Sequence, residues 1–197
     1  MPQKTLRFKI HQDGRVEETV EGFTGNSCND ATKNLEDALG KVTVKKKTTD
    51  AFISNQNENL KQLNKESKSH FSTIKTQLKE VEPLIKALNN LGYPINQEEK
   101  YIKGYRGKFT AVDISMNLPG ETKVGFKWDN NLNAYELVTD LDLWKFEIPV
   151  ERFISKVTQM YAYQTIISKT KDEGYQVVEQ KNKNDGSIEL VLTKWDN

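Results

Sequence analysis

The chain opens on an alternation of apolar and basic residues. Large apolar side chains at positions 6, 8 and 10 are separated by Arg7 and Lys9, which is the period-two pattern of a strand with one face in a core. Asp13-Gly14 then indicates a tight turn. Residues 15–22 predict a second strand that returns antiparallel, with acidic and hydroxyl side chains on its exposed face. This segment therefore predicts a β-hairpin.

The next residues have the spacing of an amphipathic helix that ends at Gly40. The positions that form its apolar face are Cys28, Ala31, Thr32, Leu35, Ala38 and Leu39. A hairpin and one helix, about forty residues in all, bury too little apolar surface to be stable alone. We therefore expect this N-terminal unit, residues 1–40, to dock onto the rest of the chain.

A polar stretch separates this unit from a larger part. Residues 41–68 are rich in Lys, Asn and Gln and have too few large apolar side chains to offset the entropy of ordering them. We interpret them as a flexible linker with an r.m.s. reach of roughly 30 Å. The predicted organisation is an N-terminal hairpin-helix unit over 1–40, the linker over 41–68 and a C-terminal domain over 69–197.

The C-terminal domain begins with a mixture of strand and helix patterns. Residues 70–78 contain β-branched side chains and predict a strand. The apolar stripe after Pro83 predicts a helix that ends at Gly92. Three strands of a meander follow, over residues 109–116, 122–128 and 134–141.

The longest helical pattern covers residues 150–171, and its broad apolar face can cover a sheet. Strands over 175–180 and 188–195 follow, joined by a turn at Asn184-Asp185-Gly186. The element order is ββα, linker, βαβββαββ. It predicts an α+β fold, a two-layer sandwich whose mainly antiparallel sheet is covered by two to three helices.

Charge distribution bears on the kind of partner. Lys and Arg number 29 against 28 Asp and Glu, and the linker alone holds seven basic and three acidic residues. A nucleic-acid-binding domain usually carries a basic face, whereas a flexible basic segment makes weak, salt-sensitive contacts with phosphates. This pattern argues against nucleic acid as the main partner.

Few residues of this chain suit metal or redox chemistry. Cys28 is the single cysteine, which excludes an intramolecular disulfide and a thiolate cluster, and we interpret it as a core residue. His11 and His70 have no metal-ligand spacing, and the Gly104–Gly107 segment lacks the longer glycine run of a phosphate-binding loop. We predict no cofactor and no metal. No apolar run has the ~20 residues of a membrane span, so we expect a soluble intracellular protein.

Carboxylates and aromatic rings lie close together around the third meander strand. Glu136, Asp140 and Asp142 are near three aromatic residues, and burial of one carboxyl could suit acid–base chemistry. Alternatively, the carboxylates end the strand while the rings pack against the long helix. We identify no catalytic residue. Exposed Tyr and Trp contribute strongly to binding, and the candidate binding surface is His70, Trp128, Tyr135, Asp140, Tyr161 and Tyr163.

Several motifs carry a family resemblance. In the C-terminal domain they are SHFSTIKTQL (69–78), ALNNLGY (87–93), VGFKW (124–128), YELVTD (135–140) and QMYAY (159–163). Through them, residues 69–197 resemble the hypothetical chloroplast reading frame thirty-five family, uncharacterised proteins of cyanobacteria, algal plastids and some phages. Through FKIHQDG (8–14) and GNSCNDAT (25–32), residues 1–66 are similar to a short cyanobacterial family of unknown function.

This resemblance implies a fusion of two normally separate partners, because members of the first family usually begin with Met where this chain has Lys68. It implies a cyanobacterial cytoplasm or a plastid stroma, near photosynthetic physiology and alongside ferredoxin or an AAA+ ATPase. It brings no catalytic residues.

Two functional hypotheses follow. The first is a non-enzymatic adaptor or assembly factor whose N-terminal unit docks on the C-terminal domain and which has a protein partner. The second is a small-molecule-binding protein or enzyme with a pocket between the meander and the long helix, using Trp128, Tyr135, Asp140 and His70.

Overall fold

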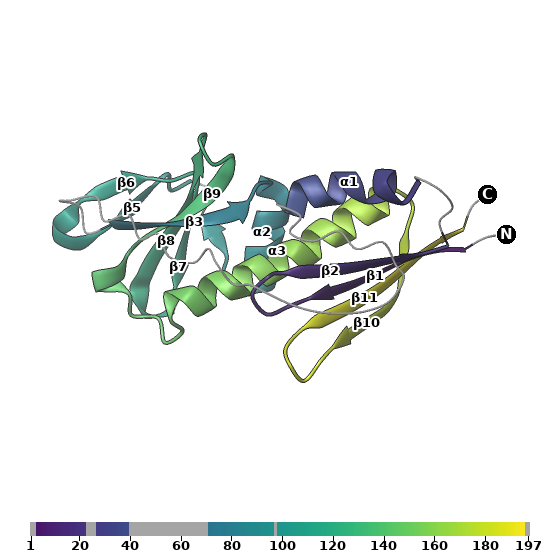
Figure 1. Cartoon of the computed structure of the whole chain (residues 1–197). Coiled ribbons are helices and arrows are strands. Elements are labelled where there is room, and N and C mark those ends of the chain that lie inside the picture. Colours follow the sequence, from purple (N-terminus) through teal and green to yellow (C-terminus); the bar gives the residue numbers. More distant parts are fainter. Residues whose placement is uncertain (1–2, 23–26, 40–70, 97, 196–197) are drawn as a thin grey trace.

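The computed structural model describes residues 3–22, 27–39, 71–96 and 98–195, and of residues 27–32 it describes the backbone alone. Within these residues, two larger sheets and a short two-stranded ribbon are arranged along one long helix, α3 (Val150–Asp172) (Figure 1). The predicted linker, His70 and the side chain of Cys28 lie outside the described residues.

The first and last strands of the chain share a four-stranded antiparallel sheet with the order β10-β11-β1-β2. Its strands are β1 (Gln3–Ile10), β2 (Val16–Glu21), β10 (Gln176–Asn182) and β11 (Ile188–Trp195). β1 is central, because it pairs with β2 on one side and with β11 on the other. The β1–β11 register runs without interruption over eight residue pairs, from Gln3↔Trp195 to Ile10↔Ile188.

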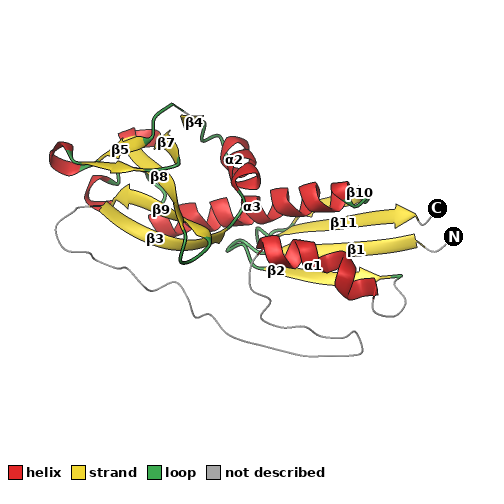
Figure 2. Ribbon diagram, turned by 90° about the horizontal axis from the view of Figure 1, so that it is seen from above, coloured by secondary structure: helices red, strands yellow, loops and turns green. Residues whose placement is uncertain are grey.

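Two helices cover one face of this sheet. α1 (Ser27–Leu39) and the second half of α3 lie over it, as the view from above shows (Figure 2). The buried side chains between them form one cluster from both ends of the chain: Leu6, Phe8, Ile10, Leu35, Ala162, Ile166, Tyr175, Leu190 and Leu192. The opposite face is mostly polar, and on it Lys9 of β1 lies between Glu189 of β11 and Glu17 of β2.

The middle of the chain forms a five-stranded sheet with the order β3-β9-β8-β7-β4. Its strands are β3 (Phe71–Leu78), β4 (Ile95–Asn96), β7 (Ile114–Leu118), β8 (Thr122–Asp129) and β9 (Ala134–Asp140). α2 (Val81–Asn90) and the first half of α3 cover one face, and the core there includes Leu84, Phe126, Leu137 and Phe153.

A two-stranded ribbon, β5 (Tyr101–Lys103) and β6 (Phe109–Ala111), packs on the other face. Ile102, Val112 and Val138 form a small buried cluster beneath it, with Phe71 packed alongside. The ribbon lies at the end of the molecule opposite the chain termini (Figure 1).

α3 belongs to both cores. Phe153, Val157 and Tyr161 are buried against the five-stranded sheet, whereas Ala162 and Ile166 are buried in the cluster of the four-stranded sheet. A helix of 23 residues is about 35 Å long, which is enough to reach both. The sequence pattern had indicated one sheet under this helix, and the helix instead joins two.

The predicted α+β class is confirmed, with mostly antiparallel strands and three α-helices among the described residues. One predicted strand, 109–116, is divided into β6 and β7, because the chain turns at Val112 and Asp113 to pass from the ribbon into the sheet. Val112 packs directly over Gly125, where a Cβ atom would lie 2.4 Å from its Cγ1. No helix in the described part of the chain is both long and apolar enough to cross a membrane.

Candidate functional site

The structure places the residues of the predicted binding surface at separate points. Trp128 and Tyr135 face each other across β8 and β9, with ring centroids 5.1 Å apart. Asp140 lies at the far end of β9. Tyr161 is buried within α3, whereas the hydroxyl of Tyr163 donates a hydrogen bond to β10 of the other sheet. These five side chains do not converge on one surface, and their role in binding stays a prediction.

The strand pleat separates the carboxylates from the aromatic rings. Neighbouring side chains of a strand point to opposite faces, so Tyr135 packs on the helix-covered face and Glu136 points away from it. Glu136 lies beside Asp129. Burial, and then this second carboxylate, raises the pKa of Glu136, whereas the backbone N–H of Asn131 lowers the pKa of Asp129. The acidic pair and the rings therefore have no common cavity.

Asp140 has a structural role in this fold. Its side chain is 4% exposed, and it accepts hydrogen bonds from the backbone N–H groups of Tyr105, at 2.8 Å, and Asp142, at 3.1 Å. The first of these bonds fixes the ribbon turn to the end of β9. The second starts the 3₁₀ turn that follows. The interpretation of Asp140 as a strand-ending residue agrees with this geometry.

Packed side chains fill the space between the meander and α3, where the alternative hypothesis places a pocket. Phe126, Leu137 and Phe153 are each at most 1% exposed there. Tyr93 and Trp144 add ring contacts to Phe153, with centroids 5.4 and 5.9 Å apart. This region is a hydrophobic core.

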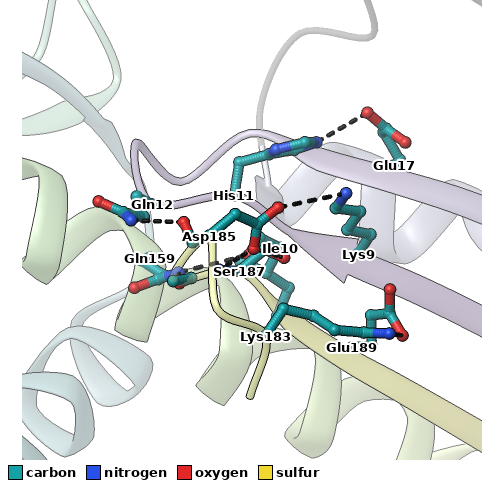
Figure 3. Close-up of polar contacts among 11 residues, drawn as sticks. Lys9, Ile10, His11, Gln12, Glu17, Gln159, Lys183, Asp185, Ser187 and Glu189 are labelled. Carbon is teal, nitrogen blue, oxygen red and sulfur yellow. Dashed lines mark hydrogen bonds and ion pairs between the residues drawn. The ribbon is translucent and has the colours of Figure 1, made fainter. Parts of the chain in front are cut away.

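Polar contacts between the two ends of the chain gather where both hairpin tips meet α3 (Figure 3). We call this cluster the hairpin joint. Its residues are Lys9, Ile10, His11, Gln12, Glu17, Arg152, Gln159, Lys183, Asp185, Gly186, Ser187 and Glu189.

Gln159 is the centre of the hairpin joint. Its Nε2 donates to the carbonyl oxygen of Ile10, at 3.3 Å, and to that of Gly186, at 2.8 Å, so one side chain of α3 holds the ends of β1 and of the β10–β11 turn. Gln12 donates to the carbonyl oxygen of Asp185 and accepts from Arg152 of α3. The first hairpin, the last hairpin and α3 are thus tied by side-chain amides.

Two glycines allow the hairpin tips to approach this closely. Gly14 has φ +86°, and a Cβ atom there would lie 2.3 Å from Cγ2 of Thr158 on α3. Gly186 has φ +72°, and its Cβ would lie 2.2 Å from Nε2 of Gln12. Both turns have a positive φ and leave no room for a Cβ atom, and glycine meets both requirements. The turns predicted from the sequence therefore also serve as contact points between the two ends of the chain.

We expect Gln159→Ala to lower the free energy of unfolding by about 1–2 kcal/mol, because two backbone carbonyls lose their donor. Urea unfolding followed by circular dichroism measures this. The matched control is Gln164→Ala on the same helix, whose amide makes a long 3.9 Å contact with Sδ of Met160 as its one hydrogen bond within the described residues. If the two variants are equally stable, Gln159 does not hold the joint.

Asp185 gives the hairpin joint a dependence on pH. The hydroxyl and backbone N–H of Ser187, and then Lys9, lower the pKa of Asp185 from 3.8 to about 2. Because the folded-state pKa lies below the unfolded value, ionised Asp185 stabilises the fold above about pH 4, and this contribution is lost as the pH falls towards about 2.

We expect Asp185→Asn to be less stable than the wild type at neutral pH and to approach it as the pH falls from about 4 to about 2. Asparagine keeps an oxygen that can accept from Ser187 but removes the titration. The measurement is the free energy of unfolding of both proteins across this range. If the difference in free energy of unfolding between the two proteins stays constant with pH, Asp185 is not the source of the pH dependence.

A second contact between the N-terminal unit and the larger domain is built on Tyr161. Its hydroxyl accepts from the backbone N–H groups of Lys79, at 3.1 Å, and Glu80, at 3.0 Å, and donates to the carbonyl of Ala38 in α1, at 3.3 Å. Burial raises the pKa of Tyr161. Nζ of Lys79 also donates to the carbonyl of Asp37. We call this contact the Tyr161 joint.

An open depression of about 420 Å³ lies beside the Tyr161 joint. Its lining residues are Asn34, Asp37, Ala38, Lys79, Glu80, Lys169, Asp172 and Glu173. Nζ of Lys169 lies 2.8 Å from Oε1 of Glu80, and this partner raises the pKa of Lys169. Burial raises the pKa of Glu173. The depression lies between α1, the two residues before α2 and the C-terminal end of α3.

The hairpin joint also contains a histidine, a carboxylate and a hydroxyl, which invites comparison with a catalytic triad. His11 Nε2 lies 2.7 Å from Glu17, but the hydroxyl of Ser187 donates to Asp185, at 2.6 Å. A nucleophilic serine must donate to the base, and here it donates to a separate carboxylate. The described residues contain no group of three or more His, Cys, Asp or Glu side chains suited to a metal ion.

No local pattern of residues predicts these joints. Gln159 is a polar residue near the apolar face of a predicted helix, and such a residue does not indicate its hydrogen-bond partner. Tyr161 was selected as a candidate for binding, and its hydroxyl in fact bonds to backbone groups of the same chain. Both residues stand in the QMYAY stretch that supported the resemblance, which was the one signal available.

Comparison with known proteins supports the two-part organisation. Residues 6–52 match a family described as a protein of unknown function, DUF2997. Proteins named "Uncharacterized protein ycf35" are similar to 127 residues of this chain, which is 64% of it and 98% of each relative. Their identities are 37% in Guillardia theta, 35% in Pyropia yezoensis and 33% in Cyanophora paradoxa.

No solved structure matches the chain. Residues 87–191, more than half of the chain, match a family described as a protein of unknown function, DUF1257. The ycf35 relatives are covered almost completely at more than 30% identity. The chain therefore belongs to the DUF1257 family.

Proposed function

We propose that the protein is a non-enzymatic adaptor or assembly factor, in which the N-terminal unit docks on the C-terminal domain and the composite binds a protein partner. The observation that carries the proposal is the uninterrupted pairing of β1 with β11 over eight residue pairs. Adding a strand to the edge of a sheet is a common way for one protein segment to bind another. In this proposal, the N-terminal unit binds the C-terminal domain by adding its strand β1 beside β11.

The docked surface has the composition of a core. Leu6, Phe8 and Ile10 are each at most 2% exposed and pack with Leu190 and Leu192 of β11. Backbone pairing supplies affinity in such contacts, and alternate side chains supply specificity. The hairpin joint and the Tyr161 joint add polar contacts at the two borders of this surface. Together these features support a built interface between the two parts.

The family match extends the proposal to related proteins. About a third of this chain lies outside the region that the ycf35 relatives share, and the N-terminal unit matches a family of its own. A strand contact of this kind can form between two chains as well as within one.

We place the protein in a cyanobacterial cytoplasm or a plastid stroma, in keeping with the resemblance of its motifs.

Production of the two parts separately tests the docking. We expect residues 1–66 alone to be largely unfolded by circular dichroism, since forty residues supply too small a core, and to gain structure when residues 67–197 are added. A cooperative thermal transition of residues 1–66 alone would contradict the docking proposal.

Affinity capture and ligand screening test the adaptor role. We expect the tagged full chain to recover one protein in stoichiometric amount from a cyanobacterial lysate. A metabolite panel is screened in parallel by thermal shift, since a ligand at 100 times its Kd stabilises a protein by about 2.7 kcal/mol. A metabolite that gives such a shift, with no protein recovered, would favour a small-molecule function instead.

A further inference from the structure

The β5–β6 ribbon concentrates basic charge that is hidden in the overall balance. Residues 100–111 contain Lys100, Lys103, Arg106 and Lys108 and no acidic residue. The chain as a whole has a formal net charge of only +1. A near-neutral total can therefore conceal a local basic surface. The structure gathers these cations on one small element at the end of the molecule (Figure 1).

Two aromatic rings stand on the outer face of the same ribbon. Tyr101 pairs with Ala111, and Lys103 pairs with Phe109, so these four side chains share one face. Ile102 faces inward and is 1% exposed. Tyr101 is 58% exposed and Phe109 67%. The two rings occupy diagonal positions, about 7–8 Å apart at their backbone, with Lys103 opposite Phe109.

Contacts beneath the ribbon hold this face in position. Ile102 is buried with Val112 and Val138 against the five-stranded sheet. A Cβ atom on Gly104 would lie 2.6 Å from the ring of Phe71, so the turn approaches the sheet as closely as a backbone can. The backbone N–H of Tyr105 donates to buried Asp140. The rings and cations are therefore presented by a fixed element, which lowers the entropy cost of binding.

We propose that the outer face of the β5–β6 ribbon binds single-stranded nucleic acid. Bases stack on Tyr101 and Phe109, and the phosphates lie near Lys103 and Arg106. Exposed aromatic rings with adjacent cations are the combination that binds single strands without sequence preference. This inference goes beyond the adaptor proposal and does not depend on it.

Size and shape favour a thin, linear partner over a globular one. Each strand of the ribbon has three residues, and this face is far smaller than the ~800 Å² per partner that a standard protein interface buries. With one base stacked on each of the two exposed rings, it can hold a short stretch of a single strand.

The ribbon tip argues against a membrane. The tip, Tyr105–Gly107, carries Arg106 with its guanidinium 5.2 Å from the centroid of the Tyr105 ring. Insertion into a bilayer would place this charged turn deepest in the apolar region, at high cost. The exposed rings instead lie on the side of the ribbon, as stacking requires.

Fluorescence anisotropy with the full chain tests the proposal. The probes are fluorescein-labelled oligo-deoxythymidine and oligo-uridine of about 20 nucleotides at low salt. We expect the double variant Tyr101→Ala/Phe109→Ala to raise Kd about tenfold or more for both probes. Lys103→Gln should weaken binding and reduce the slope of log K against log salt by about 0.7. All three positions are exposed, and circular dichroism checks that the variants are folded.

Matched controls remove a ring and a lysine elsewhere. Trp195→Ala deletes a 60% exposed ring of the four-stranded sheet, and Lys127→Gln deletes an exposed lysine of β8. Both should bind the probes as the wild type does. The proposal is overturned if the wild type does not bind the single strands, or if the controls weaken binding as much as the ribbon variants. The proposal is also overturned if the ribbon variants bind the single strands as the wild type does and lose binding only to phosphatidylserine-rich vesicles or to polyglutamate.

Discussion

Replacement of Phe8 by alanine will lower the free energy of unfolding of the whole protein by about 3–5 kcal/mol. Phe8 belongs to β1, yet its ring is 2% exposed and packs among residues of α3 and β11. A cavity at this point removes contacts from both ends of the chain. Since small domains have only about 5–15 kcal/mol of stability, the loss is a large fraction of the total.

Chemical denaturation followed by tryptophan fluorescence and by circular dichroism measures this effect. The matched control is Phe109→Ala, which removes an equal ring from a position that is 67% exposed and should change stability by at most about 0.5 kcal/mol. An unchanged main unfolding transition in Phe8→Ala would contradict this expectation. That result would mean that the N-terminal unit unfolds apart from the domain.

Replacement of Tyr161 by phenylalanine will lower the free energy of unfolding by about 2–3 kcal/mol. The change keeps the ring in the core and removes only the hydroxyl, which accepts from two backbone N–H groups and donates to the carbonyl of Ala38. Groups left without a partner in a buried position lose more than the net value of a hydrogen bond. Tyr161 is 2% exposed, so the phenylalanine ring stays in the core, while the two N–H groups lose the one acceptor that is held in place for both of them.

Tyr163→Phe is the matched control for this prediction, because it removes an equal hydroxyl two residues further along the same helix. That hydroxyl makes one exposed hydrogen bond, 3.1 Å long, with Gln180, so the expected loss is under about 1 kcal/mol. Urea unfolding of the two variants gives the comparison. Equal losses would mean that the Tyr161 joint contributes nothing beyond an ordinary surface contact.

Local structure was predictable because it depends on neighbouring residues. The alternation at 6–10 and the glycine turns at 14 and 186 are local signals, and both hairpins appear where these signals stand. The long helix was predicted over 150–171, and α3 covers Val150–Asp172. The division of the chain into three segments remains a prediction, since residues 40–70 lie outside the described part.

The arrangement of strands was less predictable because pairing is not a local property. β1 pairs with β11 across almost the whole length of the chain, and its period-two pattern would suit any partner with one apolar face. For the same reason the sequence did not show that Phe153 and Ile166, thirteen residues apart on one helix, belong to different cores.

The candidate site shows a similar limit, although one signal was present. Tyr135 and Glu136 are adjacent in a strand, so the pleat had to place them on opposite faces. The alternation of side chains along the strand therefore already predicts that the ring of Tyr135 and the carboxylate of Glu136 lie on different faces of the sheet. The role of Asp140 depended on the ribbon turn that it holds, which no pattern near Asp140 indicates.

Native-state hydrogen exchange of the intact chain can decide whether the two ends of the chain form one cooperative sheet, since it compares the local stability of β1 with that of β11 in one sample. If the N-terminal unit is part of the common fold, the amides of both strands will exchange with the same free energy of opening, close to that of global unfolding. The contrary result is rapid exchange throughout β1 while β11 and α3 remain protected. It would show that the four-stranded sheet does not form a single cooperative unit.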